Sequence, residues 1–154
     1  MITIRFVRPT EVSTLQDLNQ EVFTDNAKYD PDIILDWAYS EVGRKYFEDL
    51  VQDPASICFV AETENGELVG YIAASPKSFS YRKSKYIEVD NMGVLPEYRS
   101  QGVGKMLMEF CLAEAKNRGY QRAFVDCYFK NEKALAFYKK NGYHEMATSL
   151  EQEL

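Results

Sequence analysis

Residues 91–105 read Asn-Met-Gly-Val-Leu-Pro-Glu-Tyr-Arg-Ser-Gln-Gly-Val-Gly-Lys. An apolar run typical of a strand leads into a turn with two glycines, Gly102 and Gly104, and then into an apolar pattern with helical spacing. The first N–H groups of a helix have no partner inside it, and the helix dipole makes that end weakly positive. Glycines let an anion come close to these groups. The stretch therefore predicts a phosphate-binding turn at the start of a helix.

Two better-known phosphate-binding turns are excluded by residue positions. A P-loop needs glycine five residues before its Gly-Lys pair and Ser or Thr after it, whereas this chain has Arg99 and Met106 there. The dinucleotide fingerprint needs a third glycine at the position of Leu107. What remains is the pattern Arg99-x-x-Gly102-x-Gly104 at the end of a strand.

The composition predicts one domain over residues 1–154, because a chain that is 45% hydrophobic and 14% aromatic can bury one core of this size. A net charge of -6 argues against a nucleic-acid partner and suits an amine-bearing one. The N-terminus lacks a signal-peptide layout and no apolar run reaches membrane-spanning length, which predicts a cytoplasmic protein without a membrane partner. Three isolated cysteines in apolar runs, without metal-ligand spacing, predict buried thiols and no bound metal: Cys58, Cys111 and Cys127.

Periodicity and turn residues predict the order β-α-α-β-β-β-α-β-α-β. Helical spacing covers the region to about residue 26 and restarts at Asp30-Pro31, with a break expected near Gly43. Asn65-Gly66 predicts a hairpin. The expected strands are residues 2–6, 57–61, 68–74, 86–94, 122–128 and 143–150, and the later helices are residues 103–118 and 131–140. Such an order is typical of a mixed sheet with helices on its faces.

This order and two motifs resemble the GNAT superfamily of N-acetyltransferases. The turn at Arg99, Gly102 and Gly104 is similar to its acetyl-coenzyme A signature, Arg/Gln-x-x-Gly-x-Gly/Ala. A second segment, Asn131 to Tyr143, is similar to the pattern Asn-x-x-Ala-x-x-x-Tyr-x-x-x-Gly-Phe/Tyr, and the two together cover about residues 84–145. The resemblance implies a single-domain α/β (α+β) fold with a mixed, mostly antiparallel sheet of six to seven strands and about four helices.

The resemblance also implies acetyl-coenzyme A as co-substrate, without a metal. In the superfamily the strand before the turn separates from its neighbour at a bulge, and Gly93 is consistent with such a bulge. Arg99 is either an accessory phosphate contact or a solvated charge. The positions that match cofactor contacts are Met92 and Val94 for the pantetheine arm, Gln101, Gly102, Val103, Gly104 and Lys105 for the diphosphate, and Asn131 near the pantetheine.

Acetyl transfer to an amine needs a base, because an alkylamine with a pKa of about 10.4 is mostly protonated near neutral pH. Three carboxylates are candidates. Glu88 is favoured because it matches the base of the histone-acetylating branch, Asp90 shares its strand face, and Asp126 matches a glutamate of another branch but is one methylene shorter. Tyr138 matches the tyrosine that protonates the leaving thiolate.

The function expected from the resemblance is N-acetyl transfer from acetyl-coenzyme A to a primary amine of a small molecule, peptide or protein. Two alternatives stay open: a regulatory module that binds acetyl-coenzyme A without turnover, and an acyltransferase that uses another acyl donor. Homodimerisation is common in the superfamily, and the chain offers no independent sign of it.

Overall fold

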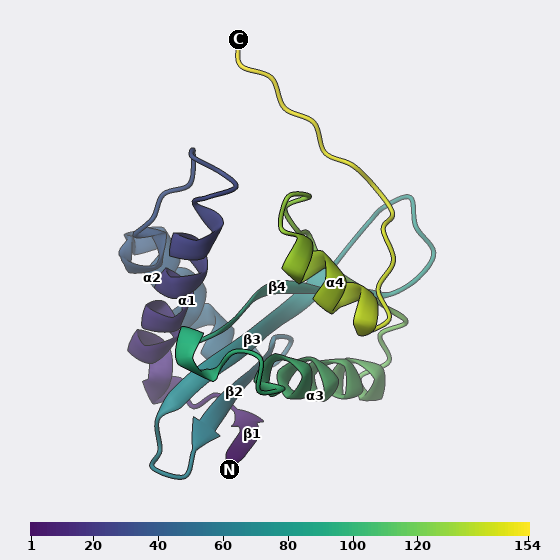
Figure 1. Ribbon diagram of the computed structural model, residues 1–154. Helices are drawn as coiled ribbons and strands as arrows, with labels where there is room; N and C mark the ends of the chain where they lie inside the picture. Colours follow the sequence, from purple (N-terminus) through teal and green to yellow (C-terminus); the bar gives the residue numbers. More distant parts are fainter.

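Five strands form one mixed sheet in the computed structural model of residues 1–154 (Figure 1). Their order across the sheet follows the sequence: β1 (Ile2–Phe6), β2 (Ile57–Thr63), β3 (Leu68–Lys77), β4 (Tyr86–Val94) and β5 (Arg122–Phe124). The first four strands are antiparallel neighbours, whereas β5 runs parallel to β4. The α/β class and the mostly antiparallel sheet predicted from the sequence are therefore confirmed.

Four helices cover the two faces of this sheet: α1 (Val12–Asn26), α2 (Glu41–Gln52), α3 (Val103–Asn117) and α4 (Glu132–Lys140). Three short 3₁₀ turns precede α1, α2 and α3, at Pro9–Glu11, Trp37–Tyr39 and Pro96–Tyr98. Figure 1 shows α1 and α2 on one side of the sheet and α3 with α4 on the other. Each face has its own apolar core, because α1 and α2 pack around Phe47 and Tyr71, and α3 packs its buried residues, such as Leu107, against the opposite face.

The predicted hairpin at Asn65-Gly66 is confirmed, since it joins β2 to β3. Gly66 has φ +82°, a conformation that residues with a Cβ rarely adopt. The turn lies at the opposite end of β3 from Ser75, where the polar site described below begins.

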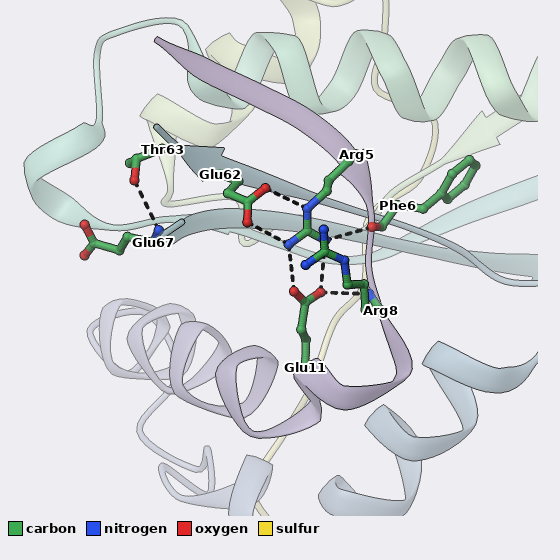
Figure 2. Close-up of polar contacts among 7 residues, drawn as sticks. All are labelled: Arg5, Phe6, Arg8, Glu11, Glu62, Thr63 and Glu67. Atoms are coloured by element: carbon green, nitrogen blue, oxygen red, sulfur yellow. Dashed lines mark hydrogen bonds and ion pairs between the residues drawn. The ribbon is translucent and has the colours of Figure 1, made fainter. Parts of the chain in front are cut away.

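An ion-pair cluster ties the first strand to the start of α1 and to β2 (Figure 2). The Arg5 guanidinium donates to Glu62 at 2.8 Å and 3.0 Å and to Glu11 at 2.7 Å and 3.1 Å. Glu11 also accepts from the backbone N–H of Arg8 at 2.7 Å. Because both carboxylates bond to this one cation, the pKa of Glu11 and of Glu62 is lowered. The cluster orients α1 against the sheet.

The expected count of six to seven strands is wrong, because the sheet has five. Residues 143–150, expected as a strand, form none, since their backbone shares no ladder of hydrogen bonds with a neighbouring strand. The strand expected over residues 122–128 stops at Phe124. Beyond Phe124 the chain turns away from β4, and its apolar residues line cavities instead of a sheet.

The second helix begins later than the sequence predicts. Residues 31–36 are irregular, and Ser40 rather than Asp30 caps α2, with its hydroxyl accepting from the Gly43 N–H at 3.0 Å. The break expected near Gly43 is also wrong, since Gly43 lies inside α2. A Cβ at Gly43 would collide with the Trp37 carbonyl oxygen. The glycine therefore allows the 3₁₀ turn to pack directly on α2.

The bulge in β4 lies at Asp90 and not at Gly93, which corrects the sequence-based expectation. Ala73 pairs with Asn91 and Ala74 with Val89, so that Asp90 is the extra residue. Gly93 has another role, because a Cβ there would overlap the Val22 side chain of α1. The glycine lets α1 lie close against β4.

The prediction of buried cysteines holds for two of the three. Cys58 and Cys111 are buried in the two cores, whereas Cys127 is half-buried in the chain that follows β5. Burial raises the pKa of the Cys127 thiol. Among the helices, none combines the length and the apolar character that crossing a bilayer requires.

Gly43→Ala should destabilise the protein by about 1–3 kcal/mol, the usual cost of overpacking. Helix propensity alone predicts the opposite sign, a gain of about 1 kcal/mol. The collision with Trp37 decides the sign. Urea denaturation measures the change, with Val42→Ala at an exposed position of α2 as the control, for which we expect little change. A stabilising Gly43→Ala would contradict this account.

Candidate functional site

A cleft of about 1150 Å³ opens where β4 and the chain after β5 diverge. β4 pairs with β5 only from Tyr86 to Glu88, so the rest of its outer edge has no neighbouring strand. The walls are the end of α1, the outer half of β4, the turn before α3, residues 125–128 and α4. Ten residues singled out from the sequence as cofactor contacts or catalytic candidates line it: Asp90, Met92, Val94, Arg99, Gly102, Gly104, Lys105, Asp126, Asn131 and Tyr138. Three others do not: Glu88, Gln101 and Val103.

The turn before α3 presents a row of free backbone donors. None of the N–H groups of residues 101–105 donates a hydrogen bond within the protein. Gly102 caps the helix with φ +83°, and a Cβ there would meet nothing within 4 Å. Ser100 also has a positive φ, 62°, which is uncommon for a residue with a side chain. Because the amides are unpaired and lie at a helix N-terminus, the turn suits an anionic group.

Arg99 is held by two protein partners beside this turn. Its Nε donates to the Val94 carbonyl at 2.8 Å, and Nη2 lies 2.7 Å from Asp25 Oδ2 at the end of α1. The Arg99 side chain is still 41% exposed, so its remaining donors face solvent. Neither expectation from the sequence described this arrangement, in which Arg99 links α1, β4 and the turn.

Asn131 caps α4 in the wall of the cleft. Its side-chain oxygen accepts from the Ala134 N–H at 3.1 Å. The capping interaction alone accounts for Asn at this position. The residue also lines the cleft, and its side-chain amide N–H groups have no partner within the protein.

Tyr138 of α4 has a hydroxyl with no hydrogen-bond partner in the protein, although its ring packs against Phe137 and Tyr143. Burial raises the pKa of Tyr138 to about 12, and nearby Cys127 adds to the rise. The phenol is therefore protonated at neutral pH, half-buried and free to donate into the cleft.

The three candidate carboxylates differ in their surroundings. Asp90 lines the cleft and accepts from Ser75 Oγ at 2.8 Å, and burial raises its pKa. Glu88 lies 3.5 Å from Lys77 Nζ, and burial raises its pKa too, with Asp90 as a further, repulsive contribution. Asp126 lines the cleft and is not hydrogen-bonded. Asp90 is thus the most enclosed carboxylate that reaches the cavity.

A polar network behind Asp90 was not predicted from the sequence. Tyr46 of α2 donates to Asp90 at 3.2 Å and accepts from Asn91 at 3.5 Å. Asn19 of α1 is fully buried and donates to the Tyr71 hydroxyl at 3.0 Å and to Asn91 at 3.4 Å. The sequence pattern around Tyr46 carries no information about a carboxylate 44 residues away, so only the structure shows this contact.

A second missed contact closes one side of the cleft. The Tyr128 hydroxyl donates to Asp30 at 2.7 Å, and the Tyr128 ring stacks with Tyr29 at 6.2 Å between centroids. The contact joins the irregular segment after α1 to the chain after β5. No sequence pattern marks it, since the two partners lie 98 residues apart.

Comparison with known proteins assigns a family to this architecture. Residues 14–143 match the profile of the Acetyltransferase (GNAT) family. An uncharacterized N-acetyltransferase of Archaeoglobus fulgidus is 34% identical over 106 residues, which are 67% of this chain and 71% of that protein. Two other curated relatives are matched over only 45% and 63% of their own length.

Solved structures share the fold over the whole chain. A mutant protein from Bacillus halodurans superposes with a TM-score of 0.84 at 20% identity, covering 99% of both chains. The enzyme AAC(6')-Iy, solved with the bisubstrate analog CoA-S-monomethyl-acetylneamine, gives a TM-score of 0.76 at 18% identity and covers 100% of this chain and 98% of its own.

Asp90→Asn should stabilise the protein at pH 8 and do so less at pH 4. A carboxyl whose pKa is raised on folding supports stability below its unfolded pKa, about 3.9, and loses that support as pH rises through the folded value. At pH 8 the buried charge is therefore a cost, which the amide removes while its oxygen still accepts from Ser75 and Tyr46.

Urea denaturation at both pH values measures the effect. Asp32→Asn removes one charge from an exposed loop and serves as the control, with little expected change. A larger gain at pH 4 than at pH 8 would contradict the assigned cause.

Proposed function

Because this chain belongs to the acetyltransferase (GNAT) family, we propose that it is an N-acetyltransferase that uses acetyl-coenzyme A and acetylates a primary amine of a small molecule, peptide or protein. The observation that supports this most is one cleft that has the turn with five free amides and the free Tyr138 hydroxyl in its walls. The free amides suit a phosphate and the phenol suits a proton transfer, and a coenzyme A thioester needs both.

The turn before α3 would hold the diphosphate. The unpaired N–H groups of Gln101, Gly102, Val103, Gly104 and Lys105 supply donors there, and the helix dipole adds a weak positive potential. Val103 contributes only its backbone, since its side chain is buried in the core. Arg99 would stiffen the turn through Asp25 and Val94 and keep its solvent-facing donors for a phosphate oxygen.

The free edge of β4 would hold the pantetheine arm. Met92 and Val94 line the cleft where β4 has no neighbouring strand, and backbone groups on such an edge bind an extended amide-containing chain as another strand would. The unpaired side-chain amide of Asn131 lies on the opposite wall and could donate to the same arm. Acetyl-coenzyme A, when bound, supplies the acetyl group as a thioester.

Asp90 would accept the proton of the acceptor amine. What supports Asp90 over Glu88 is its place in the cleft wall, which Glu88 does not share. Burial raises the pKa of both carboxyls, which brings each closer to the pKa of a useful base. Glu88, favoured on sequence grounds, forms an ion pair with Lys77. Its role would be that of a second carboxylate beside Asp90. Asp126 remains a third candidate.

Tyr138 would donate the proton that the leaving sulfur takes. Its high pKa keeps Oη protonated until the transfer, and its lack of a protein partner leaves that proton available. A phenol gives up its proton to a sulfur only as negative charge develops there, so the donation belongs to the bond-breaking step.

Release of free thiol from acetyl-coenzyme A across a panel of amines tests the function. The panel should include polyamines, amino-terminal peptides, lysine peptides and aminoglycosides, the last because a neighbouring structure is an aminoglycoside N-acetyltransferase. Thermal stabilisation by coenzyme A without release on any amine would support a binding module instead, and release only from longer acyl donors would support a different acyltransferase.

Tyr138→Phe should lower kcat on a true acceptor by at least about tenfold, a modest share of a usual general-acid contribution. Binding of coenzyme A, measured by titration calorimetry, should be unchanged. Tyr143→Phe is the matched control, because it removes a hydroxyl whose only hydrogen-bond partner is the Met108 sulfur at 3.6 Å. Equal turnover in Tyr138→Phe and the control would remove Tyr138 from the mechanism.

Three carboxylate variants locate the base through the pH profile of kcat/KM. We expect Asp90→Asn to abolish the acidic limb and to lower kcat/KM about 100-fold near neutral pH. Glu88→Gln and Asp126→Asn should retain an acidic limb. If Glu88→Gln or Asp126→Asn loses the limb while Asp90→Asn keeps it, the base is that other carboxylate.

A further inference from the structure

The two carboxylate oxygens of Asp90 have different surroundings. Oδ2 accepts from Ser75 Oγ of β3 at 2.8 Å and from the Tyr46 hydroxyl of α2 at 3.2 Å. No hydroxyl, amide or cationic group of the protein donates to Oδ1. Asp90 also lines the cleft. One oxygen is therefore held by two elements of the fold, and the other is available to a group bound in the cleft.

Tyr46 links α2 to this carboxylate without reaching the cleft. It is the only residue of α2 that is hydrogen-bonded to β4. Burial, and to a lesser extent the charge of Asp90, raises the pKa of Tyr46 above its usual range, so the hydroxyl stays protonated and can donate. The residue is not part of the cleft wall. A group bound in the cleft thus meets Asp90 and not Tyr46.

The hydroxyl of Tyr46 is oriented by a further donor. Asn91 Nδ2 donates to it at 3.5 Å, and Asn91 Oδ1 in turn accepts from Asn19 Nδ2 of α1 at 3.4 Å. Donation therefore runs in one direction, from Asn19 through Asn91 and Tyr46 to Asp90. Hydrogen bonds in such a chain polarise one another, and a chain of donors that ends on a carboxylate favours its charged form.

Asn19 begins this chain at a cost in stability. Its side chain is fully buried, and its Oδ1 has no hydrogen-bond partner. A buried acceptor without a partner destabilises the folded state, whereas an aliphatic side chain of similar size avoids that penalty. Packing alone therefore does not account for Asn19, and its donors to Asn91 and Tyr71 do.

Aromatic contacts fix the ring of Tyr46. Trp37 lies between Phe23 of α1 and Tyr46, with centroid distances of 5.5 Å and 5.6 Å. Phe47 meets the Tyr46 ring edge-on at 4.9 Å. Such pairs restrict the orientation of each ring. The stack of α1, the 3₁₀ turn and α2 thus ends on the carboxylate of Asp90.

We propose that Tyr46 is a positioning residue, whose hydroxyl fixes Asp90 through Oδ2 and leaves Oδ1 free to take the proton of the acceptor amine. The inference rests on the proposed function, in which Asp90 is the base. Tyr46 acts through Asp90 and touches neither acceptor nor cofactor. In the reaction an N–H bond of the amine breaks, a bond from that proton to Oδ1 forms, and the donor bonds to Oδ2 stay in place.

Other charged or titratable groups surround Asp90 and remain when the Tyr46 hydroxyl is removed. Burial raises the pKa of Asp90, and the donors Ser75 and Tyr46 oppose that rise. A change on removal of the hydroxyl therefore isolates its contribution. The groups that remain are Lys77 and Tyr71 of β3, Glu88 of β4, Cys111 of α3 on the other face of the sheet, and Asp25, Lys28 and Asp126 from the other walls of the cleft.

Ionisation of Asp90 in the protein without ligand tests the contact. Carbon NMR of carboxyl-labelled aspartate gives its titration midpoint, assigned by the signal that Asp90→Asn removes. Tyr46→Phe keeps the ring and should raise this midpoint by about one pH unit, because the charged form loses a donor. Tyr39→Phe is the matched control, since it takes a phenol donor from Asp17 outside the cleft, and it should leave the midpoint of Asp90 unchanged.

Kinetics on a true acceptor test the role in the reaction. Tyr46→Phe should lower kcat about tenfold, because a base that is no longer fixed reaches the productive geometry less often. KM should stay nearly the same, and the acidic limb of kcat/KM should move to higher pH with the NMR midpoint. In an Asp90→Asn background, Tyr46→Phe should have no further effect, since the two residues act as one unit.

A merely structural role for Tyr46 would lower the melting temperature but would move neither the midpoint nor the acidic limb. An unchanged Asp90 midpoint in Tyr46→Phe therefore overturns the proposal, as does an equal shift in Tyr39→Phe. A further loss of kcat on adding Tyr46→Phe to Asp90→Asn also overturns it. If no amine releases thiol, the proposed function fails, and the NMR midpoint still decides whether Tyr46 sets the charge of Asp90.

Discussion

The separation of β4 from β5 is the constraint on which the rest of the site depends. The two strands pair over three residues, and the extra residue Asp90 then shifts the pairing of β4 with β3. A bulge increases local twist and bends the strand, so the edges diverge instead of continuing the ladder. The cleft, its free β4 edge and the position of Asp90 in its wall all follow from that local irregularity.

The same bulge places a carboxylate where burial is costly. Asp90 faces the layer of α1 and α2, and Tyr46 and Ser75 donate to it while Asn91 and Asn19 continue the polar contacts into the core. Hydrogen bonds reduce the penalty of an enclosed charge without abolishing it, as the raised pKa indicates. A partly buried carboxylate with a raised pKa is typical of an active site, where selection for the reaction outweighs its cost in stability.

Local patterns in the sequence predicted much of the fold, because each depends on neighbouring residues. The Asn65-Gly66 hairpin, α3 after the glycine turn and α4 with its Asn131 cap are examples. Predictions failed where a partner distant in sequence decides the outcome. Residues 143–150 were expected to form a strand but have no neighbouring strand, and Gly43 suggests a helix break although it permits contact with Trp37.

The sequence by itself determined the family and the position of the glycine turn before α3 that we propose as the phosphate site, since both rest on short motifs whose geometry is set by glycines and helix ends. Only the tertiary structure decided where the bulge falls, which carboxylate lines the cleft and what holds Arg99. It also left the outer edge of β5 open. These features depend on contacts between residues far apart in the sequence, and the spacing of residues along one chain does not encode such distances.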